Sequence, residues 1–213
     1  MRKFITFEGG EGSGKSSQSK LLSKSLSLIN ETNLLTREPG GTPFSEKLRK
    51  MLVINNDYNL LPETELLIIY AARVEHLEKR IIPTLKKKTV ICDRYYHSTY
   101  CYQIFAKGVP EVKLKLLHKN FASNFMPDLT FFLDLSPKIG VERSLRKKQN
   151  ETRFEKKNMH FHNKIRKAFL NLAKNNKKIF KVDASCSKSL IHRKIVNHLN
   201  CKSFFKKQIP YSL

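Results

Sequence analysis

The run 8–17 has the residue types and the spacing of a phosphate-binding loop. Gly9, Gly14, Lys15 and Ser16 fit the pattern G-x-x-x-x-G-K-[ST], known as Walker A. Glycines let successive backbone N–H groups turn around an anion, and the helix that follows adds the positive end of its dipole. The lysine supplies positive charge for the β- and γ-phosphates, and the serine hydroxyl is a ligand for Mg²⁺. The residues expected to bind ATP are therefore Gly9, Gly10, Glu11, Gly12, Ser13, Gly14, Lys15, Ser16 and Ser17.

Arginines form the second group of residues that could take part in a reaction. Guanidinium groups bind phosphate in a bidentate manner and neutralise a phosphoryl group in transfer. The arginines at positions suited to a site are Arg37, Arg49, Arg73, Arg94, Arg143, Arg146 and Arg153. Those in the middle of the chain are expected opposite the Walker loop, where a second substrate would bind. Those in the polar segment 143–155 are expected on a mobile lid that closes over ATP. For any single arginine, a surface salt bridge is the alternative.

The elements that must position these residues follow a regular order along the chain. Strands are predicted at 3–7, 33–36, 89–92, 129–134 and 178–183, with helical patterns between them. Because strands alternate with helices, we expect a three-layer α/β P-loop NTPase fold with a five-stranded parallel sheet. A long helix is predicted over 63–87, with a kink near Pro83, and others over 155–175 and 187–199. Residues 1–200 are expected to form a single domain, and 201–213 a basic tail without assigned function.

Composition narrows the class of protein. The chain has 213 residues, of which 40% are hydrophobic, and this is enough for one globular α/β domain. No apolar run reaches membrane-spanning length and a predicted strand begins at once, so a cytoplasmic protein is expected. The cysteines have no C-x-x-C spacing and are expected to be free thiols, with Cys92 buried in a strand.

The formal net charge of +23 allows two interpretations. A basic surface is typical of nucleic-acid binding, since it attracts phosphates. The lysines are, however, spread over most of the chain, and a basic field also suits an enzyme with two phosphate-bearing substrates. Incidental surface charge is the favoured account.

Several motifs together resemble the nucleoside monophosphate kinases, and closely the bacterial thymidylate kinases. Besides the Walker loop these are Thr-Arg-Glu-Pro-Gly-Gly-Thr at 36–42, Glu-Lys-Leu-Arg at 46–49, Tyr-Ala-Ala-Arg at 70–73, Asp-Arg-Tyr at 93–95, Tyr-Gln at 102–103, Pro-Asp-Leu-Thr at 127–130 and Arg-Phe-Glu at 153–155. The first of these runs, followed by Asp-Arg-Tyr, is more specific than the Walker loop. The resemblance covers the chain from Phe4 to about Leu199.

The resemblance implies phosphorylation of dTMP to dTDP with ATP and Mg²⁺, by direct in-line transfer in a homodimer. It implies that Arg49 and Arg94 hold the dTMP phosphate, and that Glu38 positions acceptor, metal or water. Arg73 would bond the thymine edge. The residues implied to complete recognition of the nucleoside are Ile69, Thr99, Tyr102 and Gln103, with Tyr102 against the 2′ position. The Mg²⁺ ligands implied are Glu11, Ser16 and Asp93, and the catalytic residues are Lys15, Asp93, Arg94, Arg143, Arg146 and Arg153.

Such a reaction needs no general base, because a phosphate monoester with a second pKa near 6 is already a dianionic nucleophile at neutral pH. Catalysis requires positive charge, in-line positioning and exclusion of water. The site is accordingly rich in arginine, and the expected surface residues include the histidines His76, His97, His118, His160 and His162.

Ile69 stands where the family usually has a phenylalanine, and His97, Ile104 and Thr152 are further departures. These departures keep a kinase for another nucleoside monophosphate open as an alternative. A basic P-loop protein that binds nucleic acid and uses ATP as a switch is a third reading. Glu38 and Asp93 are also compatible with a purely structural role as partners of arginines.

Overall fold

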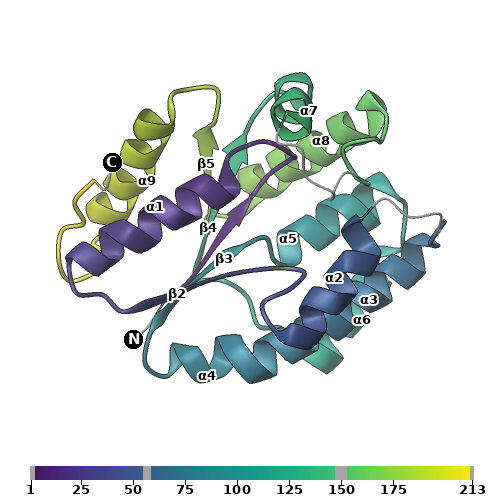
Figure 1. The fold of residues 1–213 in the computed structure, drawn as a ribbon, viewed down its shortest axis with the longest axis horizontal. Helices are drawn as coiled ribbons and strands as arrows, with labels where there is room; N and C mark the ends of the chain where they lie inside the picture. The colour runs from purple at the N-terminus through teal and green to yellow at the C-terminus, as the bar shows by residue number, and fades with distance from the viewer. Residues whose placement is uncertain (1–2, 55–58, 147–152, 212–213) are drawn as a thin grey trace.

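The computed structural model describes residues 3–54, 59–146 and 153–211, and a parallel β-sheet forms its centre (Figure 1). The strands are β1 (Phe4–Glu8), β2 (Asn33–Arg37), β3 (Thr89–Asp93), β4 (Leu129–Asp134) and β5 (Ile179–Asp183). Their order across the sheet is β2-β3-β1-β4-β5, and every neighbouring pair is parallel. The predicted fold class is confirmed.

Helices connect the strands and cover both faces of the sheet. They are α1 (Lys15–Leu28), α2 (Pro43–Val53), α3 (Pro62–His76), α4 (Ile82–Leu85), α5 (Tyr96–Thr99), α6 (Glu111–Ala122), α7 (Pro137–Leu145), α8 (Met159–Asn175) and α9 (Lys188–Cys201), with π-helical segments η1 (Leu77–Ile81) and η2 (Tyr100–Ala106). Helices α1 and α9 lie together on one side of the sheet, as Figure 1 shows. None of the helices in the described residues combines the length and apolar character that a membrane span requires.

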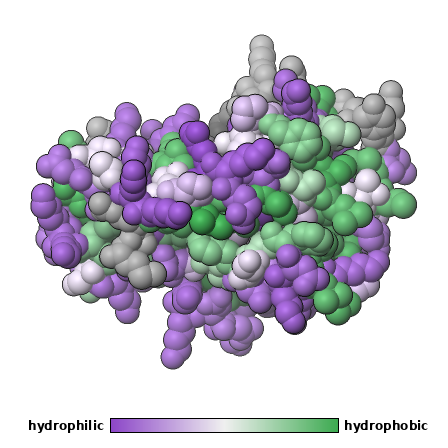
Figure 2. Space-filling model, turned by 90° about the horizontal axis from the view of Figure 1, so that it is seen from below, coloured by the Kyte–Doolittle hydropathy of each residue, from purple (hydrophilic) through white to green (hydrophobic). Residues whose placement is uncertain are grey.

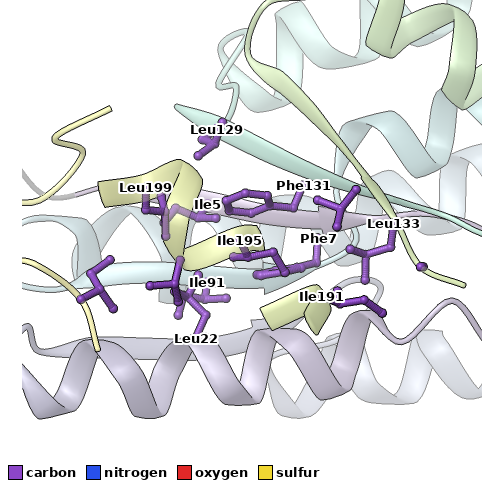
Figure 3. Close-up of a cluster of buried hydrophobic side chains, with 14 of the residues drawn as sticks. Ile5, Phe7, Leu22, Ile91, Leu129, Phe131, Leu133, Ile191, Ile195 and Leu199 are labelled. Atoms are coloured by element: carbon purple, nitrogen blue, oxygen red, sulfur yellow. The ribbon is translucent and has the colours of Figure 1, made fainter. Parts of the chain in front are cut away.

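Alternation along the strands builds a core on each side of the sheet. Ile5 and Phe7 of β1 point toward α1 and α9, where they join a cluster with Leu22, Phe131 and Ile195 (Figure 3). The intervening positions of β1 and β3, among them Phe4, Val90 and Cys92, pack against α3, η1 and α6. Both faces of the sheet are therefore covered, and side chains at its carboxyl edge are the ones left to form a site.

The predicted helix 63–87 is interrupted. Helix α3 ends at His76, and the chain passes through η1 before α4 resumes the α-helical pattern. The Ile82 N–H donates to the Leu77 carbonyl, five residues back, and Pro83, which follows, has no N–H to continue the ladder. Helix α8 likewise begins later than predicted, because the Asn158 side chain caps it by accepting from the Phe161 N–H at 3.0 Å.

The prediction that the five histidines are surface residues is wrong for four of them. His76, His97, His118 and His162 are buried, and His160 is exposed. Burial lowers the pKa of His97 and of His118 to about 4, with Arg73 as a further cause, so both rings are neutral at pH 7. These rings pack as aromatic members of the core.

Residues 202–211, which follow α9, fold back onto the core instead of projecting from it. Ile209 is buried, and its N–H donates to the Asn200 Oδ1 at 2.9 Å. Phe204 and Phe205 pack against the cluster between the sheet and α9. All four cysteines are free thiols, as predicted, and Cys92 is buried in β3.

Candidate active site

One pocket opens at the carboxyl ends of β1, β2 and β3, where parallel α/β sheets place their ligands. Every residue expected to bind the acceptor lines it, namely Glu38, Arg49, Ile69, Arg73, Arg94, Thr99, Tyr102 and Gln103. The Walker loop contributes Glu11, Gly12, Gly14, Lys15, Ser16 and Ser17 to the same pocket. The structure thus brings the two predicted halves of a site together.

The Walker loop has a conformation that its glycines make possible. Gly9, Gly12 and Gly14 have φ values of 143°, 63° and 94°, which disfavour other residues. A Cβ on Gly12 would lie 1.9 Å from the carbonyl oxygen of Gly140, because α7 packs directly on the loop. The Lys15 ammonium donates to the Gly10 carbonyl at 2.7 Å, and burial, aided by Arg94, lowers its pKa to about 8.

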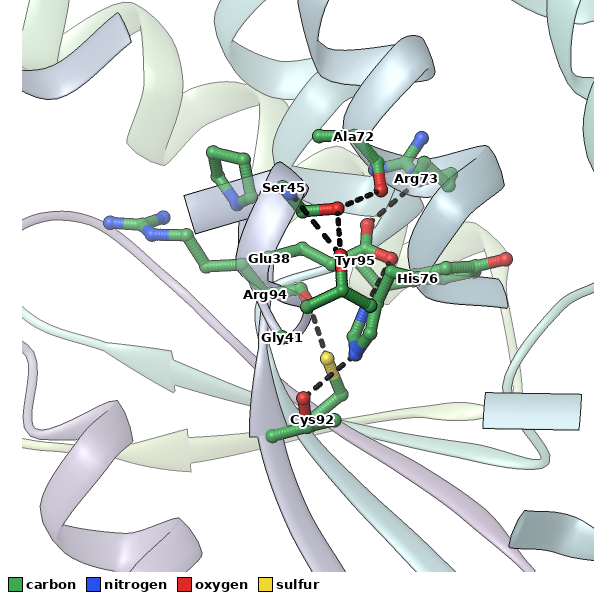
Figure 4. A network of polar contacts seen from close by, with 12 residues as sticks. Glu38, Gly41, Ser45, Ala72, Arg73, His76, Cys92, Arg94 and Tyr95 are labelled. Carbon is green, nitrogen blue, oxygen red and sulfur yellow. Dashed lines mark hydrogen bonds and ion pairs between the residues drawn. The ribbon is translucent and has the colours of Figure 1, made fainter. Parts of the chain in front are cut away.

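Glu38, at the end of β2, is held in a buried network with α3 (Figure 4). The Arg73 Nε donates to the Glu38 Oε2 at 2.8 Å, and the His76 Nδ1 lies 3.0 Å from the Glu38 Oε1. Burial alone would raise the pKa of Glu38, but Arg73 and His76 outweigh it and lower that pKa. The Arg73 guanidinium also donates from Nη2 to the Thr99 Oγ1 at 2.9 Å. A carboxylate from the β2 loop therefore fixes an arginine from α3 at the wall of the pocket.

Arg94 bonds to the Walker loop and lines the pocket where the acceptor is expected. Its φ of 70° is in the left-handed region, which few residues other than glycine adopt. The guanidinium donates to the Gly9 carbonyl at 2.9 Å and to the Glu11 Oε2 at 2.8 Å, and the Tyr102 hydroxyl donates to the Glu11 Oε1 at 2.6 Å. Burial opposes the ionisation of Glu11, yet Arg94 and Lys15 outweigh it and lower its pKa to about 2. The pocket thus contains a fixed, charged array where donor and acceptor would meet.

The comparison with protein families shows the family of the chain. The family model for thymidylate kinase matches residues 7–195. The chain belongs to the thymidylate kinase family. It is 43% identical over 186 residues to the thymidylate kinase of Onion yellows phytoplasma (strain OY-M), covering 85% of this chain and 89% of that protein.

Two further relatives extend the similarity. A thymidylate kinase of Acinetobacter baumannii is 38% identical over 199 residues, covering 92% of this chain and 99% of that protein. The crystal structure of thymidylate kinase from Ehrlichia chaffeensis matches with a TM-score of 0.76 and 32% identity, covering 93% of this chain and 98% of that one. The thymidylate kinase resemblance drawn from the motifs is confirmed.

Of the residues predicted to bind Mg²⁺, two lie in contact with each other. The Ser16 hydroxyl donates to the Asp93 carboxylate at the mouth of the Walker loop. Among the described residues no three His, Cys, Asp or Glu side chains form a preformed metal site. Mg²⁺ characteristically takes one or two protein oxygens and completes its shell with water and phosphate, so this pair fits it. Both oxygens of Glu11, in contrast, already accept from Arg94 and Tyr102.

The arginines of the predicted lid are not brought to the lining of the pocket. Arg143 donates to the Ala184 carbonyl at 3.4 Å, and Arg146 is exposed at the end of α7. Arg153 donates to the Leu52 carbonyl at 2.9 Å and forms an ion pair with Glu65. Residues 147–152 of this segment lie outside the described part of the chain. A direct role of these three arginines in transfer stays a prediction.

Some residues of the pocket wall were not predicted from the sequence. Phe154 and Glu155 line the pocket, and Phe154 packs against a cluster of Leu52, Val53 and Ile69. Their only sequence signal is the motif Arg-Phe-Glu at 153–155, whose arginine is the residue predicted to act. Glu8 was also missed: it is fully buried, accepts from the Tyr95 N–H at 2.8 Å, and burial raises its pKa.

Proposed function

We propose that this chain transfers the γ-phosphoryl group of ATP to dTMP, giving dTDP and ADP, with the pocket residues described above as its catalytic and binding groups. Membership of the thymidylate kinase family supports the reaction. The observation that carries the assignment of residues is the single pocket that joins a Walker loop to Arg49, Arg73, Arg94 and Gln103.

The Walker loop holds the donor. Lys15 and the backbone N–H groups at the start of α1 bind the β- and γ-phosphates. Ser16 and Asp93 would hold Mg²⁺, which neutralises charge on the phosphates when it is bound. The role of Glu11 in this proposal is to fix Arg94 and Tyr102.

The opposite side of the pocket holds the acceptor. Arg49 and Arg94 receive the dTMP phosphate, and Arg94 places it next to the loop because its guanidinium bonds the Gly9 carbonyl. Arg73 and Gln103 bond the edge of the base. The apolar cluster of Ile69 with Leu52, Val53 and Phe154 packs against its face. Phe154 thereby supplies aromatic surface in a wall where Ile69 has none, which supports binding of a nucleobase here despite the departure at position 69.

The mechanism follows from charge and position. Because the acceptor phosphate is a dianion at neutral pH, the protein does not need to remove a proton from it. Its task is to bring two anions into line and to offset their repulsion, and the positive charges of Lys15 and Arg94, both bonded to carbonyls of the Walker loop, do this. The buried histidines have no part in the transfer.

Steady-state kinetics with a panel of monophosphates tests the proposal. With ATP and Mg²⁺ in a coupled ADP-release assay, dTMP should give the highest kcat/KM, dUMP a lower value and ribonucleotides a poor one. Comparable turnover of CMP or GMP would favour the alternative of a kinase for another nucleotide. ATP hydrolysis that is stimulated by nucleic acid and insensitive to dTMP would favour a nucleic-acid-dependent switch.

We also propose a cytoplasmic homodimer. Exposed apolar side chains gather on α2, α3 and α6, and Figure 2 shows hydrophobic surface on the side where Figure 1 places these helices. They are Phe44, Met51, Leu67, Val112, Leu116 and Phe121. Exposed apolar side chains gathered on neighbouring helices in this way support association with a second copy. Light scattering should give a dimer that Leu116→Arg dissociates and that Leu190→Arg, on α9, leaves intact; a monomeric wild type would contradict this.

A further inference from the structure

Glu65 is a buried carboxylate that the proposed reaction does not use. It lies on α3, its side chain is fully buried, and it is not among the residues that line the pocket. Three donors from other parts of the chain converge on it. The Lys107 ammonium and the Gln103 Nε2 donate to its Oε2 at 2.5 Å and 3.2 Å, and the Arg153 guanidinium donates to its Oε1.

Of these donors, only Gln103 lines the pocket, and an amide has two ends of opposite character. An ionised carboxylate accepts hydrogen bonds and donates none, so Gln103 must turn its NH₂ group toward Glu65. The amide oxygen is then the end left for the pocket. We propose that Glu65 is a positioning residue that sets the choice of nucleobase by fixing the orientation of the Gln103 amide.

The neighbouring arginine supplies the complementary group. Arg73 is held by Glu38 and Thr99, and its Nη1 is buried without a hydrogen-bond partner in the described residues. A buried donor without a partner is costly, and a ligand acceptor would satisfy it. Arg73 and Gln103 line the same pocket, so the Gln103 amide oxygen offers an acceptor to the same ligand. This donor–acceptor pair matches the O4 acceptor and the N3–H donor of thymine, whereas cytosine presents an amino donor and an N3 acceptor there.

This inference rests on the proposed function and deepens it, because it explains selection between two pyrimidines by a residue that does not touch the base. Lys107 and Arg153 complete the arrangement. As pure donors they require Glu65 to present its oxygens, and Lys107 shares the oxygen that Gln103 uses.

The test exchanges the carboxylate for an amide while keeping the charge balance of the cluster. In the double variant Glu65→Gln/Lys107→Met, the oxygen of the new amide accepts from Arg153 and its NH₂ faces Gln103. Gln103 must then offer its oxygen to this NH₂ group and turn its own NH₂ into the pocket. Lys107→Met alone is the matched control, because it removes the same cation and retains the carboxylate.

The measured quantity is the ratio of kcat/KM for dTMP to kcat/KM for dCMP, in which the fraction of active enzyme cancels. We expect the double variant to lower this ratio about tenfold or more, with the KM for ATP changed less than about twofold. The control should change the ratio less than about twofold. A double variant that loses activity toward both nucleotides in proportion, or a control that shifts the ratio equally, would overturn the proposal.

A second measurement uses the wild-type protein, so it does not depend on the folding of a variant. In a crystal structure of the wild-type protein with dTMP, one end of the Gln103 amide should contact Glu65 and the other the base N3. A Gln103 side chain that leaves Glu65 when dTMP binds would overturn the role of Glu65. Wild-type turnover of dTMP is unaffected by that outcome, so failure here is distinct from failure of the proposed function.

Discussion

Substitution of Arg73 by lysine separates recognition of the base from recognition of the phosphate. The Arg73 guanidinium forms a 2.8 Å bond from Nε to Glu38, a 2.9 Å bond from Nη2 to Thr99, and has its third nitrogen buried without a partner in the described residues. Lysine can retain the ion pair with Glu38, but it cannot reproduce the planar fork. A hydrogen bond to a charged group contributes about 1.5–3 kcal/mol, which corresponds to a loss of about 10- to 150-fold in kcat/KM for dTMP.

The assay compares Arg73→Lys with Arg49→Lys, a matched change at a residue assigned to the phosphate. Arg49 donates to the Pro39 carbonyl at 2.9 Å and lines the same pocket. Arg73→Lys should lower kcat/KM for dTMP more than for dCMP, whereas Arg49→Lys should lower both by the same factor. Thermal melting of both variants serves as a control for folding. Equal losses with both nucleotides in Arg73→Lys would refute the placement of Arg73 at the base.

Three further predictions concern the charge of Lys15, the packing of α7 on the Walker loop and the buried histidines. Because the pKa of Lys15 is lowered to about 8, this side chain loses its charge above pH 8. The kcat/KM for ATP should therefore fall above pH 8, while kcat with both substrates saturating stays level. A kcat/KM for ATP that stays level above pH 8 would contradict this. Gly140→Ala places a Cβ 2.3 Å from the Glu11 carbonyl oxygen. It should destabilise the protein by about 1–3 kcal/mol in urea titrations and raise the KM for ATP. In the control variant Gly10→Ala the new Cβ meets no atom within 4 Å, so stability should be unchanged. The pKa values of His97 and His118 are about 4, below the value near 6.5 of an unfolded chain, so the unfolded state binds more protons between these two pH values. The free energy of unfolding should therefore fall between pH 7 and pH 5 by about 1–2 kcal/mol per histidine. A flat profile would show that these rings are not buried as neutral groups.

The local motifs of the chain predicted much of this structure. The Walker loop and the strands depend on neighbouring residues, so their sequence patterns predict them. The prediction that Arg49, Arg73 and Gln103 share a pocket depended on the family motifs, because these residues are far apart in sequence.

Features that long-range packing creates were not predictable from the sequence. In η2 the hydrogen bonds reach five residues back, so a period of about 3.6 residues does not place Tyr102 and Gln103. His76 appears as a polar residue on a helix, and only the approach of Glu38 and Thr36 makes a buried position favourable for it. Gly140 has no local signal at all, since its small size matters only because α7 contacts the Walker loop.

In the proposed reaction, donor and acceptor nucleotides meet in one pocket between the Walker loop and the arginines of α2, α3 and the loop after β3. A crystal structure with dTMP and a non-hydrolysable ATP analogue tests it most directly. We expect the γ-phosphate at Lys15, the dTMP phosphate at Arg49 and Arg94, and the base between Arg73 and the wall that contains Ile69. A dTMP molecule bound with its base at the Walker loop, or outside this pocket, would contradict the account.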